Sequence, residues 1–304
     1  MSEVILETAG LSKKFGSRWA VKDLNLRVNA GDVFGFLGPN GAGKSTTIRM
    51  ILTLLEPTSG NVKIFGTEVR RSREFVLSRV CGIVEKPDFY LYLSAYRNLE
   101  ILGSLTRKVT KDEIHNALEI VGLKSRAKDR VKTFSHGMKQ RLGIAQAILT
   151  KPELVILDEP TSGLDPQGMK EVRDLVRTLS KDHGTTILLS SHLLTEVEAV
   201  ANRMAVLNHG ELVAQGDVSE LLNGDRTYYS ITATPREKAL EILRKLDWVE
   251  VAQADAAIDV HIDSSRAAEL NRILVTGGVE VSSFAARRTL EDYFLKITEG
   301  ASEV

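Results

Sequence analysis

The sequence predicts an α/β protein with a mainly parallel sheet, followed by a small α+β domain, and two patterns support this. Short apolar runs alternate with helical patterns up to about residue 220, and the cycle of strands and helices becomes shorter after Gly224. The length of 304 residues also favours two domains over one. We therefore expect a larger domain over residues 1–224 and a smaller one over residues 225–304.

The N-terminal region shows the alternation of apolar and polar residues that is typical of antiparallel strands. Residues 4–6 begin one strand, and residues 24–28 carry leucine or valine at every second position. The run at residues 33–37 is apolar on both faces, as a buried parallel strand is. A helix from Ser45 to Leu55 is expected to follow, and Pro57 is expected to end it.

Further apolar runs are expected to form buried strands of the same sheet, at residues 80–84, 154–157, 187–189 and 205–207. Between the first two runs, Thr110 and Glu113 predict a capping box for a helix that Gly122 closes. His209 precedes Gly210 and is expected in a hairpin turn rather than in a site, because such turns need residues that accept a positive φ.

The region after Gly224 predicts a small domain of strands and helices. Strands are expected at residues 228–233, 249–251, 258–262 and 279–284, and helices at residues 236–246, 267–275 and 290–297. This region shows no recognisable catalytic pattern.

Composition disfavours several classes of protein. Forty Lys and Arg residues balance forty Asp and Glu residues, so the neutral chain lacks the positive charge that binding to nucleic acid requires. The single cysteine, Cys81, excludes a disulfide framework within one chain and is expected to be a core residue of an apolar strand. The sequence shows neither a membrane span nor a signal peptide, so we expect a cytoplasmic protein.

A glycine-rich segment after the strand at residues 33–37 fits the pattern G-x-x-x-x-G-K-[ST], which predicts nucleotide binding. Its residues are Gly38, Pro39, Asn40, Gly41, Ala42, Gly43, Lys44, Ser45 and Thr46. Glycines let successive backbone N–H groups point at phosphate oxygens, and the helix N-terminus adds its positive end. Lys44 is expected to reach the β- and γ-phosphates of ATP, and the Ser45 hydroxyl is expected to bind Mg²⁺.

Two carboxylates, Asp158 and Glu159, directly follow the apolar run at residues 154–157. This position is the carboxyl end of a buried strand, where ligands bind in open α/β sheets. Asp158 is expected to hold Mg²⁺ through water, and Glu159 is expected to act as general base on the attacking water.

Further motifs, in order along the chain, resemble those of ATP-binding cassette (ABC) ATPases. Residues 134–141, Phe-Ser-His-Gly-Met-Lys-Gln-Arg, resemble the signature loop, and residues 162–165, Ser-Gly-Leu-Asp, resemble the D-loop. His192 resembles the switch histidine, and Phe15 stands where the family places an aromatic that stacks on adenine. The resemblance covers about residues 4–220 and implies a P-loop NTPase cassette with an antiparallel β subdomain and a helical subdomain.

The resemblance also implies roles for these residues. In the family, the signature-loop serine and second glycine, here Ser135 and Gly137, contact the γ-phosphate of an ATP held by another subunit. Asp165 belongs to the same nucleotide site, and His192 bridges the γ-phosphate and helps to hold Glu159. ATP then lies between two cassettes in a head-to-tail dimer, formed with a second copy or with a homologous cassette.

Two positions depart from the usual pattern of the family. His136 stands at the first glycine of the signature loop, which affects how closely the loop packs. Glu85 stands where the family usually has a glutamine that contacts Mg²⁺. The run Glu85-Lys86-Pro87 resembles exporter ATPases of the antibiotic-resistance, bacitracin-like type.

As a whole, the resemblance implies the ATP-hydrolysing subunit of a membrane exporter. Such a subunit is cytoplasmic and is held at the inner face of the membrane by a separate integral membrane permease. We expect the surface around residues 85–99 to contact that permease. The C-terminal domain is similar to extensions of some exporter ATPases, for which regulation or dimer contact is the expected role.

Two other functions remain open from the sequence. The first is a soluble cassette ATPase in translation or DNA maintenance, which the single cassette, the lack of coiled-coil heptads and the neutral charge disfavour. The second is a nucleotide-gated switch with little hydrolysis, which Glu85 and His136 suggest.

Overall fold

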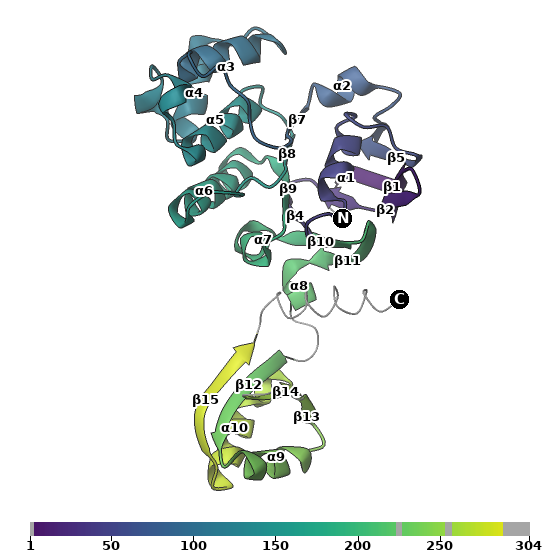
Figure 1. Cartoon of the computed structure of the whole chain (residues 1–304), viewed down its shortest axis with the longest axis vertical. Helices are drawn as coiled ribbons and strands as arrows, with labels where there is room; N and C mark the ends of the chain where they lie inside the picture. The colour runs from purple at the N-terminus through teal and green to yellow at the C-terminus, as the bar shows by residue number, and fades with distance from the viewer. Residues whose placement is uncertain (1–2, 223–226, 253–256, 288–304) are drawn as a thin grey trace. The chain divides into compact units, whose positions relative to one another are not determined.

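A computed structural model describes residues 3–222, 227–252 and 257–287 (Figure 1). The described residues form two compact units that divide after Val218. The first unit contains two sheets and the second unit contains one, and each unit has its own apolar core. The helix predicted at residues 290–297 lies outside the described residues.

A six-stranded sheet with the order β11-β10-β4-β9-β8-β7 occupies the centre of the first unit. Its strands are β4 (Val33–Leu37), β7 (Val80–Ile83), β8 (Leu154–Leu157), β9 (Thr186–Ser191), β10 (Arg203–Asn208) and β11 (Glu211–Asp217). All pairs are parallel except that of β10 with β11. The prediction of a mainly parallel sheet from five apolar runs is therefore confirmed.

Burial differs between the middle and the edge of this sheet. Every residue of β4, β8 and β9 is buried, whereas in β7 only Ile83 is buried. The expectation of a fully buried strand was wrong for β7, because this strand is at the edge of the sheet. At the other end, His209 and Gly210 have φ angles of 47° and 84° and form the predicted hairpin turn.

The N-terminal region forms an antiparallel sheet, as predicted, with the order β2-β1-β5-β6 and with β3 paired to β1. Its strands are β1 (Val4–Phe15), β2 (Arg18–Leu24), β3 (Arg27–Asn29), β5 (Ser59–Ile64) and β6 (Thr67–Glu68). This sheet matters for the site because β1 and β2 present Phe15 and Arg18 beside the phosphate loop.

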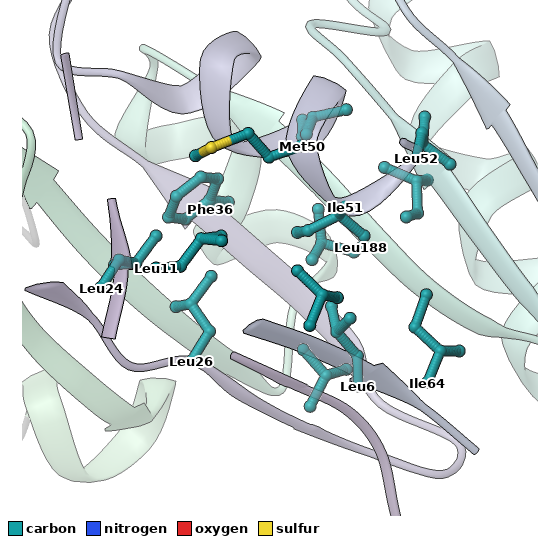
Figure 2. Close-up of a cluster of buried hydrophobic side chains, with 14 of the residues drawn as sticks. Leu6, Leu11, Leu24, Leu26, Phe36, Met50, Ile51, Leu52, Ile64 and Leu188 are labelled. Carbon is teal, nitrogen blue, oxygen red and sulfur yellow. The ribbon is translucent and has the colours of Figure 1, made fainter. Parts of the chain in front are cut away.

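Helix α1 (Lys44–Ile51) joins the two sheets through a shared apolar core (Figure 2). Ile51 of α1 packs in one buried cluster with Phe36 of β4 and Leu6 of β1. Each such side chain contributes roughly 1.5–3 kcal/mol by leaving water. The helix stops short of the predicted Leu55 because Thr53 has a φ of 58°, which an α-helix cannot contain.

Helices cover both faces of the parallel sheet. Neighbouring residues of a strand point to opposite faces, so adjacent positions of β4 show which helix covers each face. Phe36 points to the α1 side, whereas a Cβ on Gly35 would lie 2.2 Å from Val197 of α7, so α7 covers the other face. The first unit also contains α2 (Arg73–Leu77), α3 (Ala95–Ser104), α4 (Lys111–Ile120), α5 (His136–Ile148), α6 (Pro166–His183) and α7 (Leu194–Val200). Helices α3, α4 and α5 form a separate helical group, and α6 lies on the side of α7 (Figure 1).

The capping box of α4 is confirmed. The Thr110 side chain accepts a hydrogen bond from the backbone N–H of Glu113, and the Glu113 carboxylate accepts one from the backbone N–H of Thr110 at 2.9 Å. Arg107 also contacts this carboxylate and, together with the capping bonds, lowers the pKa of Glu113 to about 2. The start of α4 is therefore fixed by local chemistry that the sequence already displays.

The second unit is a four-stranded antiparallel sheet, in the order β13-β14-β12-β15, with two helices packed against it. Its elements are β12 (Thr227–Thr234), α9 (Arg236–Arg244), β13 (Glu250–Ala252), β14 (Ile258–Ile262), α10 (Ala267–Thr276) and β15 (Glu280–Arg287). The chain order β-α-β-β-α-β with this strand order is the ferredoxin-like arrangement. The strands and helices predicted within the described residues are present here.

Candidate active site

A cleft of about 540 Å³ opens where the chain leaves the carboxyl ends of β4, β8 and β9. The residues that line it include Phe15, Asn40, Lys44, Ser45, Glu159 and His192. Since these parallel strands are neighbours in the sheet, their carboxyl ends meet at one edge and bring distant parts of the chain together.

The phosphate loop needs glycine at two positions, because neighbouring backbone leaves no space there for a side chain. A Cβ on Gly38 would lie 2.4 Å from the carbonyl oxygen of Leu207, and a Cβ on Gly43 would lie 2.4 Å from that of Ala20. Gly43 also has a φ of 106°, which L side chains rarely adopt. The tight loop therefore leads directly into the N-terminus of α1, which has no side-chain cap and whose first backbone N–H groups form a geometry that binds anions.

Lys44 is buried at the base of the cleft, with 5% of its surface exposed. Its Nζ donates to the carbonyl oxygens of Gly38 at 2.7 Å and Pro39 at 3.2 Å, and it lies 3.2 Å from Oε1 of Glu159. The loop thus holds the ammonium group beside its own backbone, where phosphate oxygens would meet it.

Asp158 and Glu159 differ in their surroundings although they are adjacent. Asp158 is 4% exposed, and its Oδ1 accepts a hydrogen bond of 2.6 Å from the hydroxyl of Ser190 on β9. The same Ser190 oxygen accepts the backbone N–H of Glu159 at 2.9 Å. Glu159 has a φ of 50°, a sharp turn that directs its side chain into the cleft. Ser190 therefore connects both carboxylates to the next strand.

His192 completes this group of residues. Its Nδ1 lies 2.7 Å from Oε2 of Glu159, and because a carboxylate only accepts, the proton of this hydrogen bond is on Nδ1. Glu159 is thus held from two sides, by Lys44 and by His192. Three parts of the chain that were predicted to be functional from separate motifs meet in one place.

Phe15 lies at the rim of the cleft, at the end of β1, and is 52% exposed. The Nζ atom of Lys13 lies 5.2 Å from the centre of its ring. An exposed phenyl ring has a large apolar face in water, so a flat ligand that stacks on it gains from burial.

The signature loop and the D-loop residue are placed elsewhere. Ser135 is exposed, and its hydroxyl caps α5 by accepting the backbone N–H of Met138 at 3.2 Å. Asp165 caps α6, since its Oδ1 accepts the backbone N–H of Gly168 at 2.9 Å. Ser135, Gly137 and Asp165 do not line the cleft of their own chain.

Glu85 also lies outside the residues that line the cleft. Its carboxylate forms an ion pair with Arg49, which is one turn beyond Ser45 on α1. Glu85 has a φ of 67° at the end of β7. No sequence pattern points to Arg49, whereas Ser190 stands out as a polar residue at the end of an apolar strand.

Comparisons with known proteins reveal clear relatives. A family model described as "ABC transporter" matches residues 21–162. The chain is 41% identical over 302 residues to the bacitracin transport ATP-binding protein BcrA of Bacillus licheniformis, and the match covers 98% of each protein. The chain belongs to the ABC transporter family.

Other members of the ABC transporter family support this assignment. The chain is 36% identical over 311 residues to the daunorubicin/doxorubicin resistance ATP-binding protein DrrA of Streptomyces peucetius, over 96% of this chain and 92% of DrrA. A solved ATP-binding subunit of an ABC transporter superposes with a TM-score of 0.63 at 30% identity, over 71% of this chain and 91% of that subunit. The expected P-loop cassette fold is therefore confirmed, and the cassette is an ATP-binding ATPase.

The donor set of the cassette fits Mg²⁺ bound together with a phosphate ligand. Within the described residues, no group of three or more His, Cys, Asp or Glu side chains could hold a metal ion. The Ser45 hydroxyl and the buried Asp158 carboxylate are oxygen donors of the kind that Mg²⁺ takes, and Mg²⁺ usually completes its shell with water and phosphate oxygens.

No helix among residues 3–222, 227–252 and 257–287 is long and apolar enough to cross a bilayer.

Proposed function

We propose that this cassette is the ATP-hydrolysing motor of a membrane exporter and that it works as a head-to-tail dimer. The observation that carries the proposal is the separation of the site into two parts. Lys44, Glu159 and His192 converge in the cleft, whereas Ser135 and Gly137 lie outside the cleft of their own chain. A second cassette, related by a two-fold axis, can supply the missing serine and glycine to each ATP.

In this dimer the phosphate loop binds the triphosphate. Backbone N–H groups of Gly43, Lys44 and Ser45, at the N-terminus of α1, face the phosphate oxygens. The ammonium group of Lys44 is already at the base of the cleft. When ATP binds, it leaves Glu159 and contacts the β- and γ-phosphates instead. Phe15 stacks on adenine, and Asp165 completes the dimer interface from the start of α6.

Hydrolysis then requires Glu159 as general base and His192 as the group that positions it. Release of Glu159 from Lys44 leaves the carboxylate free to accept a proton from water, while His192 keeps it oriented. Ser45, Asp158 and Glu85 are the proposed residues for Mg²⁺, which supplies charge neutralisation between the phosphates when it is bound. Glu85 must first leave Arg49 to take that role.

The surface around residues 85–99 is proposed to contact an integral membrane permease. Tyr90, Leu91 and Tyr92 are 46%, 48% and 67% exposed, and three consecutive exposed apolar side chains are typical of a docking surface. Asn98 holds this segment in place by accepting the backbone N–H of Tyr90 at 2.8 Å and donating to its carbonyl at 3.1 Å. The permease holds the cassette at the cytoplasmic face of the membrane.

The substrate is proposed to be an antibiotic-like compound that the permease selects. Relatives along nearly the whole chain are named for transport of bacitracin and for resistance to daunorubicin and doxorubicin, which favours export over a soluble role in translation or DNA maintenance. The ferredoxin-like unit is proposed to regulate the cassette or to extend the dimer contact. Its deletion should then change ATPase activity, dimer formation or transport.

The permease contact can be tested by co-purification from membranes. Leu91→Ala combined with Tyr92→Ala should reduce the amount of permease that is retained, because both exposed side chains lose apolar contact area. Leu105→Ala is the matched control, since Leu105 is 79% exposed but follows α3. If the unchanged cassette associates with no integral membrane protein, the proposed function fails.

A further inference from the structure

His136 connects the signature loop to the segment that follows Glu159. It is the first residue of α5, between Ser135 and Gly137, and its Nε2 lies 3.3 Å from the carbonyl oxygen of Ser162. A carbonyl oxygen only accepts hydrogen bonds, so this contact requires the proton on Nε2. The ring also lies over Gly163, where an added Cβ would lie 3.6 Å from Nε2.

Ser162 belongs to the nucleotide site of the same chain. It lines the cleft, and its backbone N–H donates to the carbonyl oxygen of Glu159 at 3.1 Å, which closes a turn directly after the proposed base. A short path of contacts therefore runs from Glu159 through the turn to Ser162 and then to His136. Glycine, which the family usually carries at this position of the signature loop, has no side chain that could form this path.

We propose that His136 is a positioning residue that couples the two ATP sites of the dimer. The inference rests on the proposed head-to-tail arrangement, in which Ser135 and Gly137 contact the ATP held by the second copy. That contact fixes the start of α5, and His136 then fixes the carbonyl of Ser162 and the turn that carries Glu159. ATP in one site thereby orients the base in the other, and the coupling is reciprocal by symmetry.

The test compares the ATP dependence of hydrolysis in the full chain with that of His136→Ala and His136→Gln. We expect the Hill coefficient of His136→Ala to fall toward 1 and its maximal rate to fall roughly fivefold, the effect of losing one hydrogen bond. His136→Gln should retain cooperativity, because its amide can donate to the Ser162 carbonyl at a similar reach. Binding of ATP to the isolated cassette should be unchanged in both variants.

His183→Ala is the matched control, because His183 is exposed at the end of α6 and does not line the cleft. Cooperative wild-type activity that persists in His136→Ala overturns the role of His136 and leaves the dimer intact. An equal loss of cooperativity in His136→Ala and His136→Gln also overturns the role of His136, since the hydrogen bond to Ser162 then has no specific effect. A wild-type chain that hydrolyses ATP without cooperativity and never dimerises contradicts the proposed function itself.

Discussion

Nδ1 of His192 lies 2.7 Å from Oε2 of Glu159, and the other oxygen of this carboxylate lies 3.2 Å from Nζ of Lys44. Both oxygens of Glu159 are therefore engaged. His192 can keep its hydrogen bond when ATP binds, whereas Lys44 is attracted to the phosphates of ATP. Exchange of Glu159 for phosphate at Lys44 frees only one oxygen of the base and leaves its orientation to His192. Binding of ATP and activation of Glu159 are thus a single rearrangement.

Replacement of Glu159 by glutamine should separate ATP binding from hydrolysis. Glutamine has the size of glutamate but accepts no proton from water at neutral pH, so the rate of phosphate release should fall roughly 10²- to 10⁴-fold. ATP binding should persist, because the variant has no carboxylate that competes with the phosphates of ATP for Lys44. Light scattering should then detect accumulated dimers when ATP is present.

Glu211→Gln is the matched control for this experiment. Glu211 of β11 forms an exposed ion pair with Lys22 and is not among the residues that line the cleft. Its hydrolysis rate should equal that of the unchanged chain. Full turnover by Glu159→Gln would exclude Glu159 as the base.

Replacement of Phe15 by alanine should weaken ATP binding with little effect on the phosphate loop. The loss should be about 1–3 kcal/mol by analogy with stacking of bases on aromatic residues, or roughly 5- to 150-fold in affinity. Phe15→Tyr should retain the affinity, and binding of tripolyphosphate should be unchanged because it has no base. Calorimetry of both ligands measures this difference.

Phe75→Ala serves as the control, because Phe75 is 59% exposed but belongs to α2. An equal loss of ATP and tripolyphosphate affinity in Phe15→Ala would show that the ring supports the loop instead of stacking on adenine.

The composition of the cleft could be predicted from the sequence because each part is a contiguous motif at a strand end. Lys44, Glu159 and His192 each follow an apolar run, and parallel strands place those ends at one edge of a sheet. The fold class followed from the same runs. An apolar run does not, however, distinguish a middle strand from an edge strand, which is why the burial of β7 was predicted incorrectly.

Two contacts between different elements could not be predicted. Arg49 meets Glu85 because α1 lies close to the end of β7, and His136 meets Ser162 because α5 begins beside the turn after β8. Both contacts depend on the order of strands in the sheet and on helix packing. Periodic patterns in the sequence contain no information about either.

The ion pair between Arg49 and Glu85 should set the Mg²⁺ requirement of the ATPase. Arg49→Ala frees the carboxylate of Glu85, so the Mg²⁺ concentration for half-maximal activity should fall about fivefold, as expected for one charge interaction near the surface. Glu85→Gln should raise that concentration. Stability should change by less than about 1 kcal/mol in both variants, because the two side chains are 40% and 69% exposed.

Lys124→Ala is the control for charge removal, since Lys124 pairs with Glu119 at 2.9 Å in the helical group. Its Mg²⁺ dependence should be unaffected. A Mg²⁺ dependence that is identical in Arg49→Ala, Glu85→Gln and the unchanged chain would remove Glu85 from the metal site.

The single cysteine allows a direct test of the environment of β7. Cys81 is only partly buried and so is not the core residue that was expected, but its partial burial still raises the pKa of the thiol from 9.0 to about 11, because the charged thiolate loses contact with water. At pH 8 the folded chain should therefore contain about 100-fold less thiolate than an ordinary cysteine and should react with iodoacetamide correspondingly slowly. The unfolded chain in denaturant should react at the ordinary rate.

The same shift predicts the direction of a pH effect on stability. The folded state favours the neutral thiol, so this contribution to the free energy of unfolding is complete below pH 9 and is lost as the pH rises through about 11. In Cys81→Ser, the free energy of unfolding should therefore fall less as the pH rises. Denaturant titrations of the variant and the unchanged chain between pH 8 and pH 11 can measure this difference. Rapid labelling of the folded chain at pH 8 would mean instead that β7 opens easily at the edge of the sheet and leaves Cys81 in contact with water.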